Sequence, residues 1–340
     1  MKMSVRDNTS DPILVSGAGG FIGGWLVGYL RQAGFEKLRA VDNKLESDWY
    51  QRHPEVDNRV ADLRSLDECR DAIRDVRQVY NLACDMGGMG FIEANRAACM
   101  TSVLINTHLL MAGQEADVMR HFFASSACVY NVELQQIPEV TALREEDAYP
   151  AMPEDGYGWE KLFSERMCRH FYEDFGTEAR VARYHNVYGP HGTYEGGREK
   201  APAAICRKVA LAKLSGHKEI EIWGDGEQTR SFTYIDDCLY GTLEIMNSDI
   251  REPINLGSSE LVSINDLVDI VEEIAGTRLR RRYDLGAPKG VRGRNSDNTM
   301  INDRLGWEPS TPLAVGLERT YAWIYDQLGS TGRIGRQAVA

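Results

Sequence analysis

Short apolar runs alternate with longer stretches of helical spacing along the first half of the chain. Strands are predicted at 13–15, 38–41, up to Val60, 76–83, 121–126 and 178–184. Helices are predicted at about 20–33, 93–114 and 157–175. This alternation favours a parallel sheet with helices on both faces. We therefore predict an α/β fold built on a Rossmann-type, doubly wound parallel sheet.

The pattern becomes looser after the tripeptide YGP at 188–190. Further helices are predicted around Pro202, which suits a first helical turn, and from about Ser263 and Thr311. We expect a Rossmann domain over 1–187, to which 231–250 returns. A smaller C-terminal α/β domain for the substrate is expected over 188–230 and 251–330. The last ten residues, 331–340, are expected to form a flexible tail.

Composition and charge narrow the classes of function. The chain has 340 residues, of which 43% are hydrophobic and 26% charged, as in ordinary globular proteins. The net charge of −12 argues against a nucleic-acid partner, which needs a basic surface to displace counterions. No apolar run reaches the ~20 residues that span a bilayer, and the N-terminus lacks the apolar stretch of a signal peptide. We therefore expect no nucleic-acid partner and no membrane association.

The seven cysteines are scattered, odd in number and form no CxxC pair. A disulfide framework or a zinc site would be clustered. We expect free thiols, no metal site and a cytoplasmic location.

The segment 17–23, GAGGFIG, follows the first predicted strand and opens the first predicted helix. A tight turn of bare backbone allows a diphosphate to sit against the positive N-terminus of a helix. Glycine-rich turns also occur for steric reasons alone, so the surrounding pattern matters. We predict a dinucleotide site with contacts from Gly17, Gly20, Phe21, Ile22 and Gly23.

Two aspartates follow the next strands. Asp42 ends the second strand, where a carboxylate can hydrogen-bond a ribose hydroxyl and would repel a 2′-phosphate. This favours NAD over NADP as the cofactor. Asp62, after the third strand, could meet the adenine edge, and Leu63 and Ala83 are expected to contact the cofactor too. The alternative for each aspartate is a role in capping its loop.

The pattern YGWEK places Tyr157 and Lys161 four residues apart, on one face of a helix. A nearby ammonium and a positive nicotinamide would lower the pKa of the phenol from ~10 toward neutrality. The phenolate could then take the proton of a sugar hydroxyl while hydride leaves for the cofactor. Ser126, at the end of the fifth strand, could hold the same hydroxyl. On its own this pattern also fits a half-exposed helix face.

Together these motifs resemble those of the extended short-chain dehydrogenase/reductases. The resemblance rests on 17–23, 125–127, Tyr157 with Lys161, and 188–190. It implies a Rossmann domain, a smaller C-terminal domain that binds a nucleotide sugar, and a homodimer formed through long helices. Dehydratases of this family carry an Asp-Glu pair just after the serine. This chain has Ala127 and Cys128 there, which disfavours dehydration.

A sugar oxidised at carbon 4 has acidic hydrogens at carbons 3 and 5, so an epimerase at those carbons needs an acid and a base. Cys128 lies two residues after Ser126, and nearby positive charge would lower its pKa from ~8.5. Lys200 sits just before a predicted helix, whose N-terminus would lower the pKa of the amine. The alternatives are a small buried cysteine and a solvated surface lysine.

Longer runs resemble the GDP-mannose 3,5-epimerases over most of the chain. They are 83–91, 124–128, 196–204, 223–226, 228–233 and 290–298. The resemblance implies GDP-mannose as substrate and Cys128 with Lys200 as the acid/base pair. It also implies substrate contacts from Gly87, Gly88, Ser126, Asn186, Glu199, Lys200, Ala201, Lys208, Gln228, Arg230 and Arg294. From charge alone, Arg230, Arg292, Arg294 and Lys208 are candidate partners for a diphosphate in this acidic protein.

Two alternatives stay open. One is another NAD-dependent sugar-nucleotide epimerase, such as a 4-epimerase or an enzyme for UDP-sugars. The other is a non-catalytic protein that senses nucleotides, although such a protein need not retain Tyr157, Lys161, Cys128 and Lys200 together.

Overall fold

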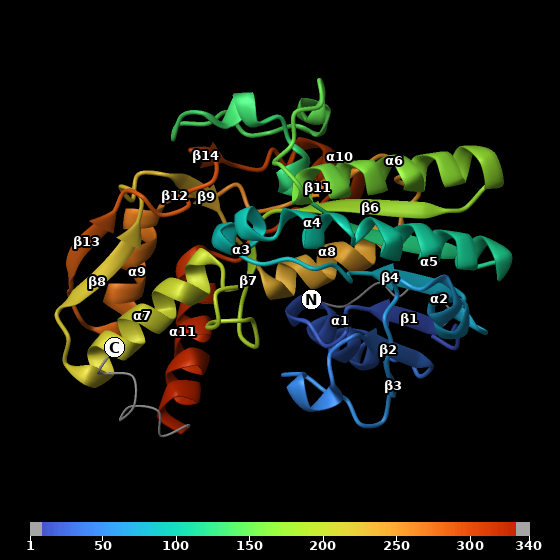
Figure 1. Ribbon diagram of the computed structural model, residues 1–340, viewed down its shortest axis with the longest axis horizontal. Coiled ribbons are helices and arrows are strands. Elements are labelled where there is room, and N and C mark those ends of the chain that lie inside the picture. The colour runs from blue at the N-terminus through green and yellow to red at the C-terminus, as the bar shows by residue number, and fades with distance from the viewer. Residues whose placement is uncertain (1–8, 331–340) are drawn as a thin grey trace.

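The computed structural model describes residues 9–330, and its largest element is a seven-stranded sheet (Figure 1). The strand order is β11-β6-β5-β4-β1-β2-β3, and every neighbouring pair is parallel. The strands are β1 (Ile13–Ser16), β2 (Leu38–Asp42), β3 (Asp57–Val60), β4 (Gln78–Asn81), β5 (Arg120–Ser126), β6 (Ala179–Tyr184) and β11 (Ile254–Leu256). This order reverses between β1 and β4, as in doubly wound sheets. The predicted Rossmann-type sheet is confirmed.

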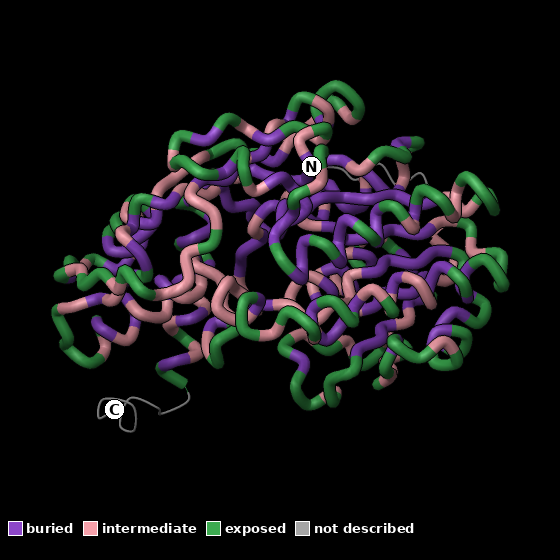
Figure 2. The backbone as a smooth tube through the Cα atoms, turned by 45° about the horizontal axis from the view of Figure 1, so that its top comes forward, coloured by how far each residue is buried: buried purple, intermediate pink, exposed green. Residues whose placement is uncertain are grey.

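Both faces of the sheet are buried except at the edge strand β3, and alternate side chains of one strand contact the two faces. In β1, Ile13 and Val15 join the apolar cluster that includes α1 (Phe21–Gln32) and α8 (Ile235–Asn247). Leu14 joins the cluster on the other face, with α2 (Leu66–Ile73) and α5 (Val103–Glu115). Figure 2 shows this buried backbone running through the sheet, with exposed segments around it. The near-continuous apolar runs of the sequence reflect burial on both faces.

The predicted long helix over 93–114 is wrong, because three helices replace it. They are α3 (Met89–Ala94), α4 (Arg96–Met100) and α5. The first break falls at Asn95, whose side chain donates to the carbonyl of Phe91 at 2.9 Å. The second falls at Ser102, whose hydroxyl accepts the backbone N–H of Asp85 at 2.9 Å. Short polar side chains that bond the backbone in this way compete with helix continuation.

The second half of the chain builds a smaller α/β unit beside the sheet (Figure 1). Its helices α7 (Ala201–Ser215), α9 (Ile264–Ala275) and α11 (Leu313–Ser330) pack against one another. α7 also packs on β8 (Glu219–Trp223), which pairs in parallel with β13 (Arg280–Asp284). Helices with Pro202 in the first turn and near Ser263 and Thr311 are confirmed. The domain bounds remain a prediction, and the expected tail over 331–340 lies outside the described residues.

The remaining elements are short or complete the two units. The helix α6 (Tyr157–Phe175) packs on β5 and α5. The others are β7 (Val187–Tyr188), β9 (Thr229–Ser231), β10 (Thr233–Tyr234), β12 (Leu261–Ser263), β14 (Gly293–Arg294), α10 (Thr299–Leu305) and the 3₁₀ turns η1 (Glu46–Asp48), η2 (Ala127–Val129), η3 (Val132–Gln135) and η4 (Glu145–Ala148). Between residues 9 and 330, none of the helices combines the length and apolarity needed to cross a membrane.

Candidate active site

A bare glycine turn joins β1 to α1 at the carboxyl edge of the sheet. Gly17 has φ +76°, and a Cβ on Gly23 would lie 2.1 Å from the carbonyl oxygen of Gly17. Gly20 caps α1 without any side-chain hydrogen bond, and a Cβ there would meet only the Gly17 carbonyl. The Gly20 N–H donates to the Gly17 carbonyl at 3.0 Å, so the open backbone N–H groups at the positive end of α1 are those of Phe21 and Ile22. This cradle fits the diphosphate of a dinucleotide.

The two predicted aspartates lie in different surroundings. Asp42 is 8% exposed, and its carboxylate accepts the backbone N–H groups of Gly19 and Lys44, each at 3.0 Å. It thus lies beside the glycine turn, as a ribose-binding carboxylate should. Asp62 is about half exposed and forms an ion pair with Arg64. That pairing holds the pKa of Asp62 below its ordinary value. Next to it Leu63 is buried, and Ala83 lies at 2.9 Å from the position of a Cβ on Gly17.

Ser126, Tyr157 and Lys161 meet at the end of β5 and the start of α6. The Lys161 Nζ lies 5.5 Å from the centroid of the Tyr157 ring, and its side chain is only 2% exposed. Its ion partner is Glu160, with Nζ and Oε2 3.6 Å apart. A hydrogen bond links the Tyr157 phenol to Ser126.

The expected lowering of the Tyr157 pKa does not come from the protein's own groups. Burial raises the pKa of Tyr157 well above its ordinary value, and the thiols of Cys84 and Cys128 add to the rise. The hydrogen bond from Ser126 opposes it without reversing it. A phenolate at this position therefore needs positive charge from a bound group.

Cys128 sits in the 3₁₀ turn η2, directly after β5. Its backbone N–H donates to the Ser126 hydroxyl at 3.2 Å, and Nη1 of Arg294 lies 3.6 Å from its sulfur. Burial raises the pKa of Cys128 to about 11, Glu154 adds to the rise, and Arg294 offsets only part of it. The lowered thiol pKa expected from nearby positive charge is therefore wrong for the protein alone. Desolvation outweighs the guanidinium.

Lys200 caps the start of α7 and faces the same group of side chains. Burial lowers its pKa, Cys128 and Cys84 oppose the shift, and Arg294 adds to it. The expected direction is confirmed, although burial is the main cause. The segment before Lys200 touches the loop after β4, because a Cβ on Gly88 would lie 2.5 Å from the carbonyl oxygen of Glu199.

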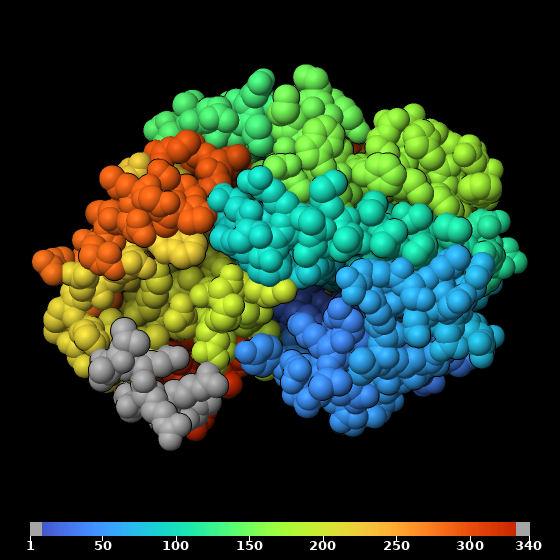
Figure 3. All heavy atoms as spheres, in the orientation of Figure 1, coloured from blue at the N-terminus to red at the C-terminus, as the bar shows by residue number. Residues whose placement is uncertain are grey.

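Figure 3 shows the surface hollowed where the dark-blue N-terminal part, the cyan segment near residue 90 and the yellow-green segment near 200 meet. Gly87 and Gly88 are neighbours in the loop after β4. The Gly88 N–H donates to the carbonyl of Arg198 at 3.1 Å. Glu199 is paired with Arg207, at 3.1 Å, and Ala201 begins α7. These predicted residues thus lie together.

Three of the predicted cations, Arg230, Arg292 and Arg294, form a second group at β9 and β14, whereas Lys208 lies on α7 against β8. Burial lowers the pKa of Arg230 to about 10, and Arg294 adds to the effect. Arg292 is engaged by Asp225, with Nη1 and Oδ1 2.9 Å apart. Lys208 donates to the Glu221 carbonyl at 2.9 Å and lies over the Trp223 ring.

The two predicted amide side chains belong to the same region. Gln228 donates to the Trp223 carbonyl at 2.8 Å, and its buried Oε1 has no hydrogen-bond partner among residues 9–330. Asn186 has φ +42° and donates to the Ser231 carbonyl at 3.0 Å. The amide of Gln228 is therefore free to accept a hydrogen bond from a ligand.

Sequence reasoning missed two side chains at this site. Glu154 is 7% exposed and forms an ion pair with Arg294, and Cys84 hydrogen-bonds the Tyr157 phenol. Cys84 stood in a run that resembled known epimerases, so that run could have pointed to it. Glu154 carried no such indication, because its partner is 140 residues away along the chain.

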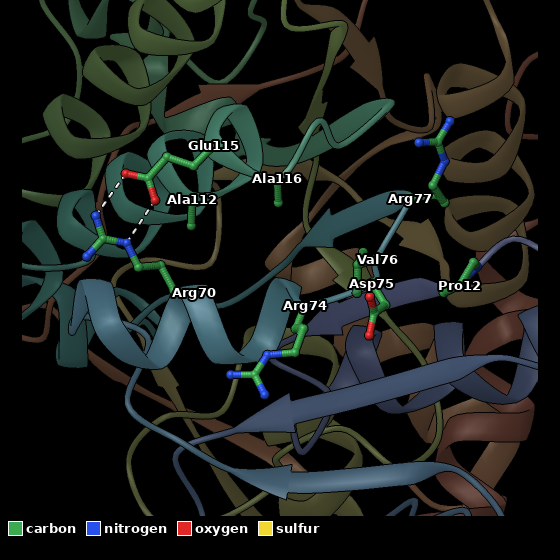
Figure 4. A pocket seen from close by; sticks show the side chains of 9 residues that line it. All are labelled: Pro12, Arg70, Arg74, Asp75, Val76, Arg77, Ala112, Glu115 and Ala116. Carbon is green, nitrogen blue, oxygen red and sulfur yellow. Dashed lines mark hydrogen bonds and ion pairs between the residues drawn. The ribbon is translucent and has the colours of Figure 1, made fainter.

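A separate surface pocket of about 660 Å³ lies at the opposite edge of the sheet (Figure 4). It is lined by Pro12 and Arg77, which precede β1 and β4, and by residues of α2 and α5. Ligands of doubly wound sheets bind at the carboxyl ends of the strands. This pocket is therefore not part of the candidate active site.

Comparisons with known proteins identify relatives of this chain. The sequence model of the NAD dependent epimerase/dehydratase family matches residues 13–257. GDP-mannose 3,5-epimerase 1 of Oryza sativa subsp. indica is 45% identical over 323 residues, which cover 93% of this chain and 82% of the rice protein.

Two solved structures are similar over 93% of this chain and 99% of their own. UDP-glucose 4-epimerase of Thermotoga maritima, with UDP-glucose, has a TM-score of 0.83 and 26% identity. UDP-glucuronic acid 4-epimerase of Bacillus cereus, in complex with UDP-glucuronic acid and NAD, has a TM-score of 0.79 and 25% identity.

Proposed function

Because this chain belongs to the NAD-dependent epimerase/dehydratase family, we propose that it epimerises GDP-D-mannose at carbons 3 and 5. The products would be GDP-L-galactose, GDP-L-gulose or both. The observation that carries the proposal is that Cys128 lies beside the Ser126–Tyr157 pair and that Lys200 lies near Cys128. A simple 4-epimerase needs only the latter pair, whereas proton exchange at carbons 3 and 5 needs an acid and a base as well.

The cofactor is NAD, and the residues that would hold it fit a dinucleotide. The N–H groups of Phe21 and Ile22 would face its diphosphate, and the bare backbone at Gly17, Gly20 and Gly23 would let it approach. Asp42 would accept its ribose hydroxyls. Asp62, Leu63 and Ala83 would flank the adenosine. When bound, NAD accepts hydride from carbon 4 of the sugar and returns it, so it leaves the cycle unchanged.

In the redox step, Tyr157 would take the proton of the sugar 4-hydroxyl, which Ser126 holds by a hydrogen bond. The buried Lys161 ammonium, together with positive charge from the bound cofactor, would stabilise the phenolate. The carbon-bound hydrogens at 3 and 5 then become acidic, because the 4-keto group stabilises the carbanions.

In the exchange steps, Cys128 and Lys200 would remove and deliver protons at carbon 5 and then carbon 3. Burial raises the pKa of the thiol and lowers that of the amine, so it favours the neutral form of each group. In these forms the thiol would give a proton and the amine would accept one, which supplies the acid and the base of the exchange.

The substrate's diphosphate would be met by Arg230, Arg292, Arg294 and Lys208, because guanidinium and ammonium groups pair with phosphate oxygens. The remaining contacts would come from Gly87, Gly88, Asn186, Glu199, Ala201 and Gln228. Arg292 would have to leave Asp225 or share its charge with it.

We also propose that the protein is a cytoplasmic homodimer. The helices α5 and α6 pack together and carry hydrophobic side chains that are 36–53% exposed, namely Leu104, Met111, Trp159 and Phe163. Such a patch supports association with a second copy.

The seven cysteines all lie within the described residues and are free, which suits a reducing compartment.

The test is proton NMR of GDP-mannose incubated with the enzyme in deuterated water. We expect loss of the signals at carbons 3 and 5, with new hexose resonances. Exchange at carbon 5 alone would narrow the function to a 5-epimerase. An unchanged spectrum from folded, NAD-loaded protein would exclude GDP-mannose. UDP-glucose and UDP-glucuronic acid should be assayed in parallel, since the similar solved structures bind them.

A further inference from the structure

Glu154 is a buried carboxylate that the proposed reaction does not use. It lies just before α6, and its backbone N–H donates to the carbonyl oxygen of Cys128 at 3.0 Å. That hydrogen bond ties Glu154 to the turn that carries the thiol. The carboxylate is therefore fixed close to Cys128 by the backbone as well as by its side-chain contacts.

One guanidinium serves both groups. Nη2 of Arg294 is paired with Oε1 of Glu154, and Nη1 lies 3.6 Å from the Cys128 sulfur. The third nitrogen, Nε, donates to the Gln135 side chain at 2.7 Å, so the guanidinium cannot turn towards either partner alone. A positive charge that already neutralises a carboxylate stabilises a neighbouring thiolate less than a free one would.

The carboxylate is not saturated with hydrogen bonds. Its second oxygen, Oε2, is buried and has no hydrogen-bond partner among residues 9–330. Burial opposes ionisation of Glu154, yet Arg294 outweighs it and holds the pKa of the carboxyl below its ordinary value. The site thus keeps an incompletely solvated negative charge next to its reactive thiol. A buried carboxylate oxygen without a partner is an exception among buried polar groups and calls for an explanation.

We propose that Glu154 is a positioning residue that keeps Cys128 in the thiol form in the resting site, by competing with the thiolate for Arg294. The proposal deepens the proposed function, in which Cys128 exchanges protons with the sugar. The other charged or titratable groups that interact with Cys128 are Arg230, Lys161, Lys200 and Tyr157. Glu154 is the carboxylate that acts on Cys128. Removal of its charge therefore leaves the surroundings of the thiol more positive, which favours the thiolate.

The test is a pH titration of the thiolate by its ultraviolet absorbance, in NAD-loaded protein. Each protein is measured against the same protein carrying Cys128→Ser, which isolates the signal of that thiol. We expect the thiolate of Glu154→Gln to form about one unit or more below that of the wild type, which is about tenfold more thiolate at a fixed pH. The rate of hydrogen exchange at carbon 5 should shift along the pH axis in the same direction.

Glu154→Asp is the matched control, because it keeps the charge and should return the titration towards the wild type. If Glu154→Gln does not fold, Glu154→Met removes the charge at similar volume and takes its place. A thiolate titration that is unchanged, or moved to higher pH, in the folded charge-deleted variant would overturn the proposal. The titration needs no turnover. A shifted thiol in a protein that leaves GDP-mannose untouched would therefore refute the proposed function and not this inference.

Discussion

Two buried arginine–glutamate pairs in this protein differ in how completely they are satisfied. In the first, Arg183 Nε and Nη2 donate to the two oxygens of Glu165 at 2.9 and 2.8 Å, and Ser125 adds a third bond. The remaining nitrogen of Arg183 donates to the Glu145 carbonyl at 2.6 Å. Both side chains are 3% exposed. This pair joins β6, α6 and β5 and leaves no carboxylate oxygen unpaired.

The second pair, Arg294 with Glu154, is almost as deeply buried, with side chains 4% and 8% exposed. It makes only one contact between guanidinium and carboxylate, and the other nitrogens turn to Gln135 and Cys128. Oε2 of Glu154 lacks a hydrogen-bond partner in the described part of the chain.

The contrast separates structural stability from reactivity. A buried ion pair compensates its desolvation only when geometry and extra hydrogen bonds are good, as at Arg183 and Glu165. At Arg294 and Glu154 part of that compensation is missing, and the unpaired groups lie around the thiol proposed for chemistry. We therefore expect substitutions at the two places to affect different measurements.

The largest expected effect is on the reaction. Cys128→Ala should lower the rate of hydrogen exchange at carbon 5 by about 10²–10⁴-fold, the usual contribution of a general acid or base. NAD binding and the unfolding midpoint should stay close to those of the wild type, because the cofactor cradle is built from other residues. Exchange is followed by NMR in deuterated water and NAD content by absorbance. Exchange retained at the wild-type rate would remove Cys128 from the mechanism.

The next effect is on stability, at the pair of Arg183 and Glu165, in which every carboxylate oxygen has a partner. Glu165→Gln should lower the free energy of unfolding by about 3–5 kcal/mol, because it leaves the Arg183 charge buried without its counterion. Urea unfolding measures this loss. The rate of hydrogen exchange at carbon 5 per folded molecule should be nearly unchanged. Glu154→Gln makes the same replacement in the other pair and is measured beside it. A protein with Glu165→Gln that is stable but inactive would contradict the division between the two pairs.

The sequence predicted the parts of this protein that depend on local pattern. Apolar runs located the first six strands, the GAGGFIG turn located the cofactor cradle, and Tyr157 with Lys161 lay on one helix face as their spacing requires. The break at Ser102 was not predicted, because it depends on a hydrogen bond from Asp85, in a loop that is distant along the chain. The helices α2, α8 and α10 were not predicted either.

The electrostatics of the site could not be predicted in the same way. The pKa of Cys128 depends on burial and Glu154, which raise it, and on Arg294, which lowers it, and burial is the largest of these effects. Its position two residues after Ser126 gave no measure of burial. Likewise, Glu154 pairs with Arg294 only because the loop before α6 and the strand β14 lie side by side in the folded protein.

A smaller effect is expected when both members of a pair are replaced together. Arg183→Met with Glu165→Leu should recover most of the 3–5 kcal/mol lost on removing one partner, because no buried charge remains. The corresponding double variant, Arg294→Met with Glu154→Leu, should also fold. Its kcat/KM should nevertheless fall about ten- to hundredfold, the loss expected for a charge-assisted hydrogen bond to the substrate. Equal activity losses in the two double variants would show that the pairs do not differ in role.

The smallest effect concerns acid. Arg294 holds the pKa of Glu154 below its ordinary value, so the carboxylate is charged in the folded protein at a pH where it is already protonated in the unfolded chain. Its stabilising contribution is therefore complete above the unfolded pKa of ~4.3 and is lost as pH falls through the lower folded value. The difference in unfolding free energy between wild type and Glu154→Gln should accordingly narrow as pH falls below about 4.3, measured by urea unfolding at a series of pH values. A difference that stays constant as pH falls would mean that the pKa of Glu154 is the same in the folded and the unfolded protein, and the contrast between the two pairs would then lie in hydrogen bonding and not in charge.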